Sequence, residues 1–181
     1  PTLISEQRLI ANVNGVMNAV VVKGDSVGAT LYYGAGAGAK ATASSVVADL
    51  IDIVRSAGDA SKGSPGNVPS LAFNSLRTDI PVLDIEDIEC EFYLRLSVYD
   101  KIGVMAQISQ LLTDYGINIE ALIQKEPDAS LDSYVFVPIV ILTGKVLERR
   151  MNEAIKAIDA LDQVVEKVTR IRIEQLDGED S

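Results

Sequence analysis

Hydrophobic and polar residues follow two clear periodicities in the second half of the chain, between Tyr93 and Glu120. Leu94, Leu96 and Val98 alternate with other residues, which is the period of two expected of a strand that buries one face. Apolar residues then recur at a helical spacing, at Val104, Ile108, Leu111, Leu112 and Tyr115. The alternation resumes after Gly116. This stretch therefore predicts a strand, a helix and a second strand.

The turn Asp100-Lys101-Ile102-Gly103 separates the first strand from the helix. The Asp100 carboxylate can accept hydrogen bonds from the free N–H groups at a helix start, and Gly103 lets the backbone turn and lets a small molecule approach it. Gly116 can end the helix in a left-handed conformation. An ordinary strand–helix–strand crossover explains this pattern, and so does a unit that senses an amino acid.

Three further elements are predicted toward the C-terminus. Residues 134–143 form a long apolar strand, in which Pro138 indicates an edge or a bulge because it cannot donate to a ladder. Residues 168–173 alternate as a last strand, and a helical stripe precedes it at Leu147, Met151, Ile155, Ile158 and Leu161. The order β-α-β-β-α-β predicts a ferredoxin-like antiparallel sheet with both helices on one face.

The sheet face without helices is predicted to be apolar as well, because it carries Tyr134, Phe136, Val140 and Leu142. An exposed apolar face of that size favours association. We therefore predict a homo-oligomer that forms through this domain.

Residues 1–33 have the pattern of three short strands, with turns at Asn14-Gly15 and at residues 23–26. A meander of the segments 8–13, 19–22 and 27–33 is the simplest arrangement of these strands on one sheet.

A run of small residues, Gly34 to Ala39, follows the third segment. Thr42, Ser44 and Ser45 then provide caps for a helix that ends near Gly58. A glycine-rich loop before a helix N-terminus presents free N–H groups and a partial positive charge, which suits an anion or a polar ring amide. The spacing differs from the dinucleotide-binding pattern G-x-G-x-x-G, so a close turn without a ligand is an equal alternative.

The chain is predicted to be an α+β protein of two parts. Residues 59–74 are rich in Gly, Ser, Pro and Asn and indicate a loop or linker, whereas residues 83–90 alternate acidic and apolar side chains like a strand. We therefore expect a partial sheet and helix at residues 1–75, a linker or edge strand at 76–90, and the ferredoxin-like domain at 91–176.

Composition narrows the possible chemistry. The chain has 16 Lys and Arg against 26 Asp and Glu, a net charge of −10, so we expect neither nucleic acid nor an anionic membrane surface as a partner. It has no histidine and one cysteine, Cys90, which excludes Ser/His and Cys/His catalysis and a His-ligated metal. We expect a cytoplasmic protein with no metal site and no catalytic residue in this chain.

Two sets of segments resemble known families. Residues 92–120, with Asp100-Lys101-Ile102-Gly103-Val104 and Gly116-Ile117-Asn118-Ile119, resemble an ACT domain. Residues 12–20 and the pattern Y-G-x-G-A-G-x-x-x-T-A-S-x-V-V-x-D, from Tyr33 to Asp49, resemble the C-terminal half of homoserine dehydrogenase. The pairing of that pattern with an ACT domain is far more specific than the ACT pattern alone.

The resemblance implies an NAD(P)-dependent oxidoreductase that interconverts L-aspartate 4-semialdehyde and L-homoserine, on the route to threonine and methionine. It implies that Gly36 and Gly38 let the backbone approach the nicotinamide, with Gly38 the stronger candidate. It further implies that Asp100, Gly103 and Asn118 lie near an amino-acid effector, for which threonine is expected.

The chain departs from the family in what it lacks. The Rossmann domain of the family, its catalytic lysine and its acidic substrate ligands have no counterpart in this sequence, and Lys40-Ala41 stands where family members often have Leu-Pro. We therefore expect a piece of a longer enzyme that by itself neither holds the cofactor nor turns over substrate. The alternatives are a free-standing ACT sensor of amino acids and a module that only dimerises.

Overall fold

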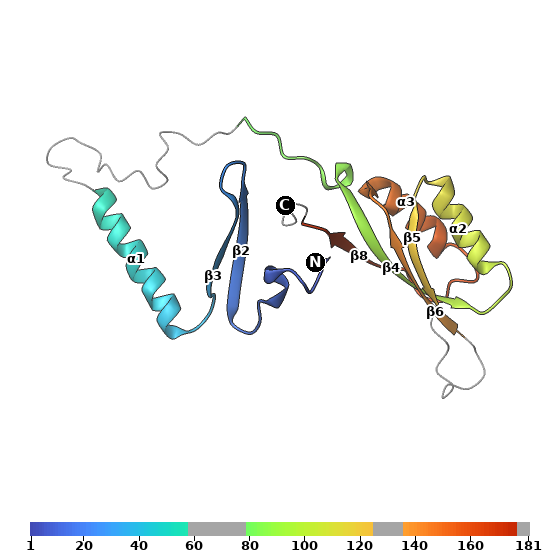
Figure 1. Ribbon diagram of the computed structural model, residues 1–181, viewed down its shortest axis with the longest axis horizontal. Helices are drawn as coiled ribbons and strands as arrows, with labels where there is room; N and C mark the ends of the chain where they lie inside the picture. Colours follow the sequence, from blue (N-terminus) through green and yellow to red (C-terminus); the bar gives the residue numbers. More distant parts are fainter. Residues whose placement is uncertain (58–78, 125–135, 177–181) are drawn as a thin grey trace. The chain divides into compact units, whose positions relative to one another are not determined.

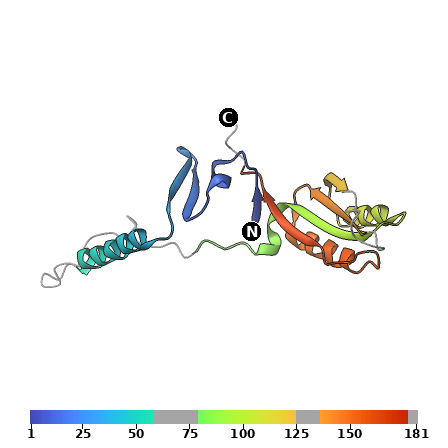
Figure 2. The same cartoon turned by 90° about the horizontal axis from the view of Figure 1, so that it is seen from below.

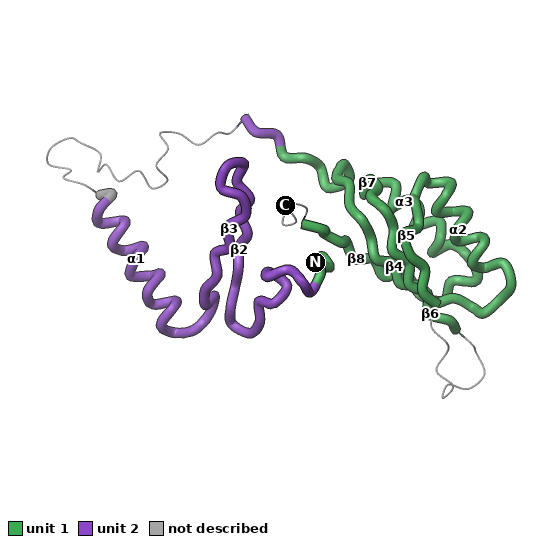
Figure 3. Tube along the Cα trace, in the orientation of Figure 1, with its two compact units in different colours: residues 1–5, 82–181 green, residues 6–81 purple. Residues whose placement is uncertain are grey.

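The computed structural model describes residues 1–57, 79–124 and 136–176. These residues form two compact units, which we call unit 1 (residues 1–5 and 82–181) and unit 2 (residues 6–81) (Figure 3). The first five residues fall in unit 1, although the predicted division placed them in a domain of residues 1–75. The predicted loop at residues 59–74 and the predicted strand residue Tyr134 lie outside the described residues.

Unit 1 is an antiparallel sheet with two helices on one face (Figure 1). Along the chain its main elements are β4 (Glu89–Tyr99), α2 (Val104–Asp114), β5 (Ile119–Gln124), β6 (Phe136–Thr143), β7 (Val146–Leu147), α3 (Glu148–Asp159) and β8 (Thr169–Glu174). The long strands lie in the order β8-β4-β6-β5, each antiparallel to its neighbour, and β7 pairs with the start of β4. The predicted α+β class and β-α-β-β-α-β order are confirmed.

The central strand β4 organises the core of unit 1. Every second residue of β4 from Phe92 to Val98 is buried. This face meets the buried stripes of the two helices, made of Val104, Ile108, Leu112, Met151, Ala154 and Ile158. Burying one large apolar side chain contributes about 1.5–3 kcal/mol, so the helical spacing of these stripes is what holds both helices on the same face.

The interpretation of Pro138 as an edge residue is wrong. Strand β6 lies between β4 and β5, and Pro138 is in register with Ser97 of β4. The described ladder between β6 and β5 stops one residue away, at the pair Ile139 and Gln124. The residue after Gln124, which would face Pro138 in the same register, lies outside the described residues.

Helix α2 begins and ends at glycines. Gly103 is its N-cap, with φ at 92°, and no side chain caps the helix. The prediction that Asp100 caps α2 is therefore wrong, since the chain turns at Gly103 and the helix starts only after it. The predicted stop at Gly116 is confirmed: φ is 69°, and the N–H groups of Gly116 and Ile117 donate to the carbonyls of Thr113 and Leu112, both at 2.8 Å.

A short N-terminal strand extends the sheet of unit 1. Strand β1 (Thr2–Ile4) runs parallel to β8, with Thr2 opposite Arg172 and Ile4 opposite Glu174, and Figures 1 and 2 show the N-terminus beside β8. A three-residue strand has too few positions to show a periodicity, so sequence reasoning did not find this pairing.

The predicted strand at residues 8–13 is wrong. Leu9–Asn12 form the 3-10 helix η1. The Asn12 side-chain amide donates to the carbonyls of Arg8 and Glu6, at 2.9 and 3.0 Å, and so satisfies acceptors that a strand would have paired. Unit 2 is therefore a two-stranded hairpin, β2 (Met17–Gly24) and β3 (Gly28–Ala35), followed by helix α1 (Ala39–Ala57), and the predicted three-stranded meander is not formed.

The acidic segment before β4 is also not the predicted strand. Residues Ile85–Asp87 form the 3-10 helix η3, because the Asp84 carboxylate accepts from the Glu86 N–H at 2.9 Å and caps the turn. The strand itself starts only at Glu89.

Unit 2 differs from unit 1 in having no core of its own. None of its described residues is buried. The apolar residues of α1, which are Val46, Val47, Leu50, Ile51, Ile53 and Val54, are 46–74% exposed. Contiguous exposed apolar patches of this kind mark interaction surfaces, so this helix is a candidate contact surface.

A buried carboxylate holds β8 to the start of α3. Glu148 is 2% exposed, and its two oxygens accept from Nε and Nη2 of Arg172 at 2.8 and 2.7 Å. Arg170 Nη1 lies 3.0 Å from the same carboxylate. The hydrogen bonds to Glu148 raise the pKa of Arg172, and burial followed by the Glu148 charge raises the pKa of the nearby Cys90 thiol.

We expect Glu148→Gln to lower the free energy of unfolding of unit 1 by about 3 kcal/mol, because it leaves two partly buried guanidinium groups without their counter-charge. Glu153, an exposed residue of the same helix, provides the matched control, and Glu153→Gln is expected to change the stability by less than about 0.5 kcal/mol. Urea unfolding followed by circular dichroism measures both. Equal stabilities for the two variants would contradict a stabilising role of the cluster.

Candidate functional site

The glycine loop between β3 and α1 contains both predicted cofactor residues. The Gly36 N–H donates to the Val16 carbonyl at 2.8 Å. Gly38 has φ at 114° and directly precedes α1, and its carbonyl accepts from the Thr42 N–H at 3.0 Å. The helix therefore starts three residues before the predicted cap Thr42, and Gly38 occupies the position where the free N–H groups of the helix begin.

One polar side chain that sequence reasoning missed lies over this loop. A Cβ built on Gly36 would come within 1.6 Å of Asn18 Nδ2, so only a glycine leaves room for the Asn18 amide. Asn18 is in register with Gly34, and a shallow hollow on the hairpin is lined by Asn18, Val20, Tyr32, Gly34 and Gly36 among others. The detectable sign in the sequence is an amide in the otherwise apolar strand Met17–Val22.

The loop offers a flat surface, hydrogen-bond donors and a helix N-terminus. Gly38 leaves the backbone open to a planar ring, because a Cβ there would meet no atom within 4 Å, whereas the Asn18 amide occupies that space at Gly36. The start of α1 supplies a partial positive charge, and the Asn18 amide can donate to or accept from a ligand. The loop can therefore bind and orient a polar ring. No group of three or more Cys, Asp or Glu side chains in residues 1–57, 79–124 and 136–176 is arranged to hold a metal ion.

The three predicted effector residues are not together in one chain. Asp100 and Gly103 follow the end of β4, where Tyr99 pairs with Phe136, whereas Asn118 precedes β5, where Ile119 pairs with Thr143. These pairs mark opposite ends of β6. At about 3.3 Å per residue the two groups are roughly 20 Å apart, so one ligand cannot touch all three residues of the same chain.

Each end has its own surroundings. A Cβ on Gly103 would meet no atom within 4 Å, so the backbone there is open to a ligand. Lys101 Nζ lies 5.2 Å from the centre of the Tyr99 ring, which packs on Phe136. At the other end, the Asn118 carbonyl accepts from the Gly144 N–H at 3.0 Å, and its amide lies 3.4 Å from a Glu120 oxygen.

Comparison with known proteins assigns both units. The family model of homoserine dehydrogenase matches residues 1–51, and that of the ACT domain matches residues 92–163. The homoserine dehydrogenase of Pseudomonas aeruginosa is 53% identical over 97% of this chain, and that of Neisseria gonorrhoeae is 47% identical over 97%. The chain belongs to the homoserine dehydrogenase family. The resemblance that the sequence predicted is confirmed, including its ACT domain.

A solved structure supports the assignment to the homoserine dehydrogenase family. The homoserine dehydrogenase of Thiobacillus denitrificans superposes with a TM-score of 0.78 at 50% identity, over 97% of this chain and 38% of that protein. The chain likewise spans 39% of the length of the Pseudomonas and Neisseria relatives. Within the described residues, no helix is long and apolar enough to cross a membrane.

Proposed function

We propose that the protein to which this chain belongs interconverts L-aspartate 4-semialdehyde and L-homoserine with NAD(P) as the hydride carrier. The observation that carries the proposal is the identity of up to 53% with homoserine dehydrogenases across both units. In that protein, this chain supplies a part of the catalytic domain that lies beside the cofactor, and a regulatory domain.

Unit 2 is the part of the catalytic domain beside the cofactor in this proposal. NAD(P) would supply the hydride chemistry, and the glycine loop would position the nicotinamide. Gly38 lets the ring approach, Gly36 makes room for Asn18, and the Asn18 amide would hydrogen-bond the ring carboxamide. No motif in this sequence matches the groups that would hold the substrate and move its proton. The chain by itself is therefore not expected to turn over substrate. The exposed apolar surface of α1 fits a unit that is completed by other parts of the protein.

Unit 1 is the regulatory domain in this proposal, and it binds an amino-acid effector, threonine, between two copies of the chain. Asp100 lies beside one end of β6 and Asn118 beside the other. A site that contains both residues therefore has to combine Asp100 of one copy with Asn118 of another. The half-buried apolar residues on the open face of the sheet, such as Tyr93, Val140, Leu142 and Ile171, fit association of copies.

A free-standing ACT sensor is the alternative. Unit 1 favours it in one respect, since its core is complete without unit 2. The match of residues 1–51 to the catalytic family and the lack of buried residues in unit 2 argue for the enzyme.

The proposed reaction is tested by the absorbance of the reduced cofactor. The intact protein is expected to reduce NAD or NADP when homoserine is added, and a protein consisting of residues 1–181 alone is expected to be inactive. Absence of any homoserine-dependent reduction by the intact protein with either cofactor would contradict the assignment.

We expect Gly38→Val in the intact protein to raise the cofactor KM or lower kcat by about tenfold, because the side chain crowds the ring and the φ of 114° disfavours it. Gly28→Val is the matched control. Gly28 also has a positive φ, 77°, and open space around its Cβ, but it lies at the hairpin turn. The same kinetic change in both variants would show that Gly38 only shapes a turn.

We expect Gly103→Asp to abolish threonine binding, because the added carboxylate occupies the open space at the turn and repels the carboxylate of the ligand. Gly103→Ala carries the same backbone strain without the charge and is expected to retain binding. Calorimetry with threonine, isoleucine, lysine and methionine measures both variants. Unchanged threonine binding in Gly103→Asp would place the effector site elsewhere.

A further inference from the structure

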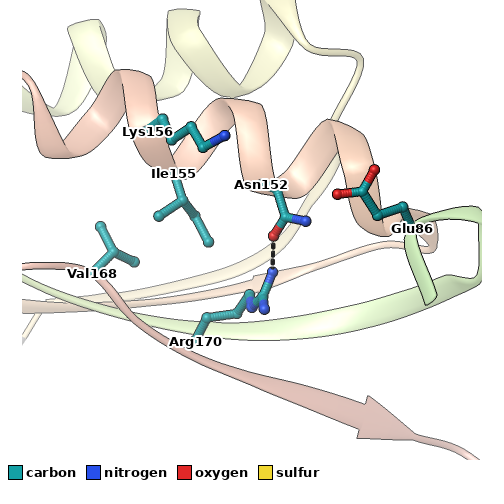
Figure 4. A pocket seen from close by; sticks show the side chains of 6 residues that line it. All are labelled: Glu86, Asn152, Ile155, Lys156, Val168 and Arg170. Carbon is teal, nitrogen blue, oxygen red and sulfur yellow. Dashed lines mark hydrogen bonds between the residues drawn. The ribbon is translucent and has the colours of Figure 1, made fainter.

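A second candidate binding site lies between helix α3 and strand β8, away from every residue discussed for the cofactor or the effector. It is a hollow of about 480 Å³ lined by Glu86, Asn152, Ile155, Lys156, Val168 and Arg170 (Figure 4). Small-molecule sites typically have volumes of about 300–1,000 Å³. The hollow therefore has the size of a site for a small metabolite.

The apolar, acidic and basic residues that line the hollow lie in different parts of it. Figure 4 shows Asn152 and Arg170 meeting in the middle, with the apolar pair Ile155 and Val168 on one side and the Glu86 carboxylate on the other. Lys156 projects from the helix above them. Two positive groups, one negative group and one apolar patch thus line a single hollow.

The positive charge of Arg170 is only partly balanced within the protein. Its Nη1 donates to Asn152 and lies 3.0 Å from Glu148 Oε1, an oxygen that Arg172 also uses. One carboxylate therefore serves two guanidinium groups. The guanidinium carbon of Arg170 also lies 5.7 Å from the centre of the Phe92 ring. A guanidinium group has five N–H donors, so Arg170 has more donors than the contacts with Asn152 and Glu148 use.

The walls of the hollow are fixed by bonds outside it. The η3 turn that carries Glu86 is capped by Asp84, and the neighbouring Asp87 forms an ion pair with Arg149 of α3. The Val168 N–H donates to the Asp159 carboxylate at 2.8 Å. These bonds hold the backbone that carries Glu86 and Val168, so that backbone loses little freedom when a ligand binds.

We propose that this hollow binds one free α-amino acid with an aliphatic side chain. The carboxylate of the ligand pairs with Arg170 and Lys156, its ammonium group pairs with Glu86, and its side chain covers Ile155 and Val168. A phosphate would be repelled by Glu86 and would leave the apolar pair uncovered, and a purely apolar ligand would give no partner to the Glu86 and Lys156 charges. A zwitterion with an aliphatic side chain is the chemical class that satisfies all of these groups. The site shares no residue with the proposed threonine site and does not depend on it.

Calorimetry on the intact protein tests the proposal with L-isoleucine and two analogues. 3-Methylpentanoic acid lacks the ammonium group of isoleucine, and 2-methylbutylamine lacks its carboxylate. We expect isoleucine to bind at least about tenfold more tightly than either analogue, because each analogue loses one charged hydrogen bond.

Two exposed lining residues allow variants that leave the fold intact. We expect Glu86→Gln and Lys156→Met each to weaken isoleucine binding about tenfold, and Glu86→Gln to leave 3-methylpentanoic acid binding unchanged. Glu153→Gln and Lys167→Met are the matched controls, since both residues are exposed and lie outside the lining. They are expected to bind isoleucine like the unmodified protein.

Three results would overturn the proposal. The first is no measurable heat with isoleucine. The second is equal binding of isoleucine and its analogue without the ammonium group, which would indicate a site for a simple carboxylate. The third is isoleucine binding that Gly103→Asp abolishes while Glu86→Gln and Lys156→Met leave it unchanged, which would assign the heat to the proposed effector site instead.

Discussion

The register between β4 and β8 is the constraint on which the polar interior of unit 1 depends. Residues that face each other across a ladder point to the same side of a sheet. Arg170 and Arg172 lie opposite Leu94 and Phe92, the buried positions of β4, so both guanidinium groups are carried toward the helix-covered face. Burying two cations there would be costly without a counter-charge. Glu148 at the first turn of α3 supplies it, and its N–H also donates to the Ile88 carbonyl at 2.9 Å.

The same arrangement shapes the surface beside the ion cluster. Arg172 takes both oxygens of Glu148, and Arg170 shares only one of them. Asn152 holds the second guanidinium group at the rim, where α3 and β8 diverge around a hollow. The cation in that hollow is thus a consequence of the strand register, while the carboxylate that faces it comes from η3. Stability and binding chemistry in this part of unit 1 arise from the same few residues.

Periodicity in the sequence was sufficient to predict the elements with a buried face. The alternation in β4 and the helical stripes of α2 and α3 are encoded by their own core contacts, and the Gly116 stop follows from its lack of a Cβ. The wrong or missed predictions concern segments whose structure is decided by a local polar contact or by pairing with a distant strand. Asn12 folds residues 9–12 into a 3-10 helix, Asp84 does the same for residues 85–87, and β1 depends on a strand about 170 residues later. The separation of Asp100 from Asn118 follows from strand direction, which spacing along the chain does not reveal.

The N-terminal strand joins the two family segments more closely than their order in the chain suggests. The match to homoserine dehydrogenase begins at residue 1, yet residues 2–4 form a strand in the sheet of unit 1, the unit that includes the ACT domain. A displacement of β8 therefore has to carry β1 with it or break their ladder. From β1 the chain runs through η1 to Val16, whose carbonyl accepts from Gly36 in the glycine loop. The segment from β1 to the glycine loop is thus one continuous stretch of this chain, residues 2–36. The ladder between β1 and β8 has three residue pairs and Leu3 is 41% exposed, so local unfolding of β1 costs little free energy.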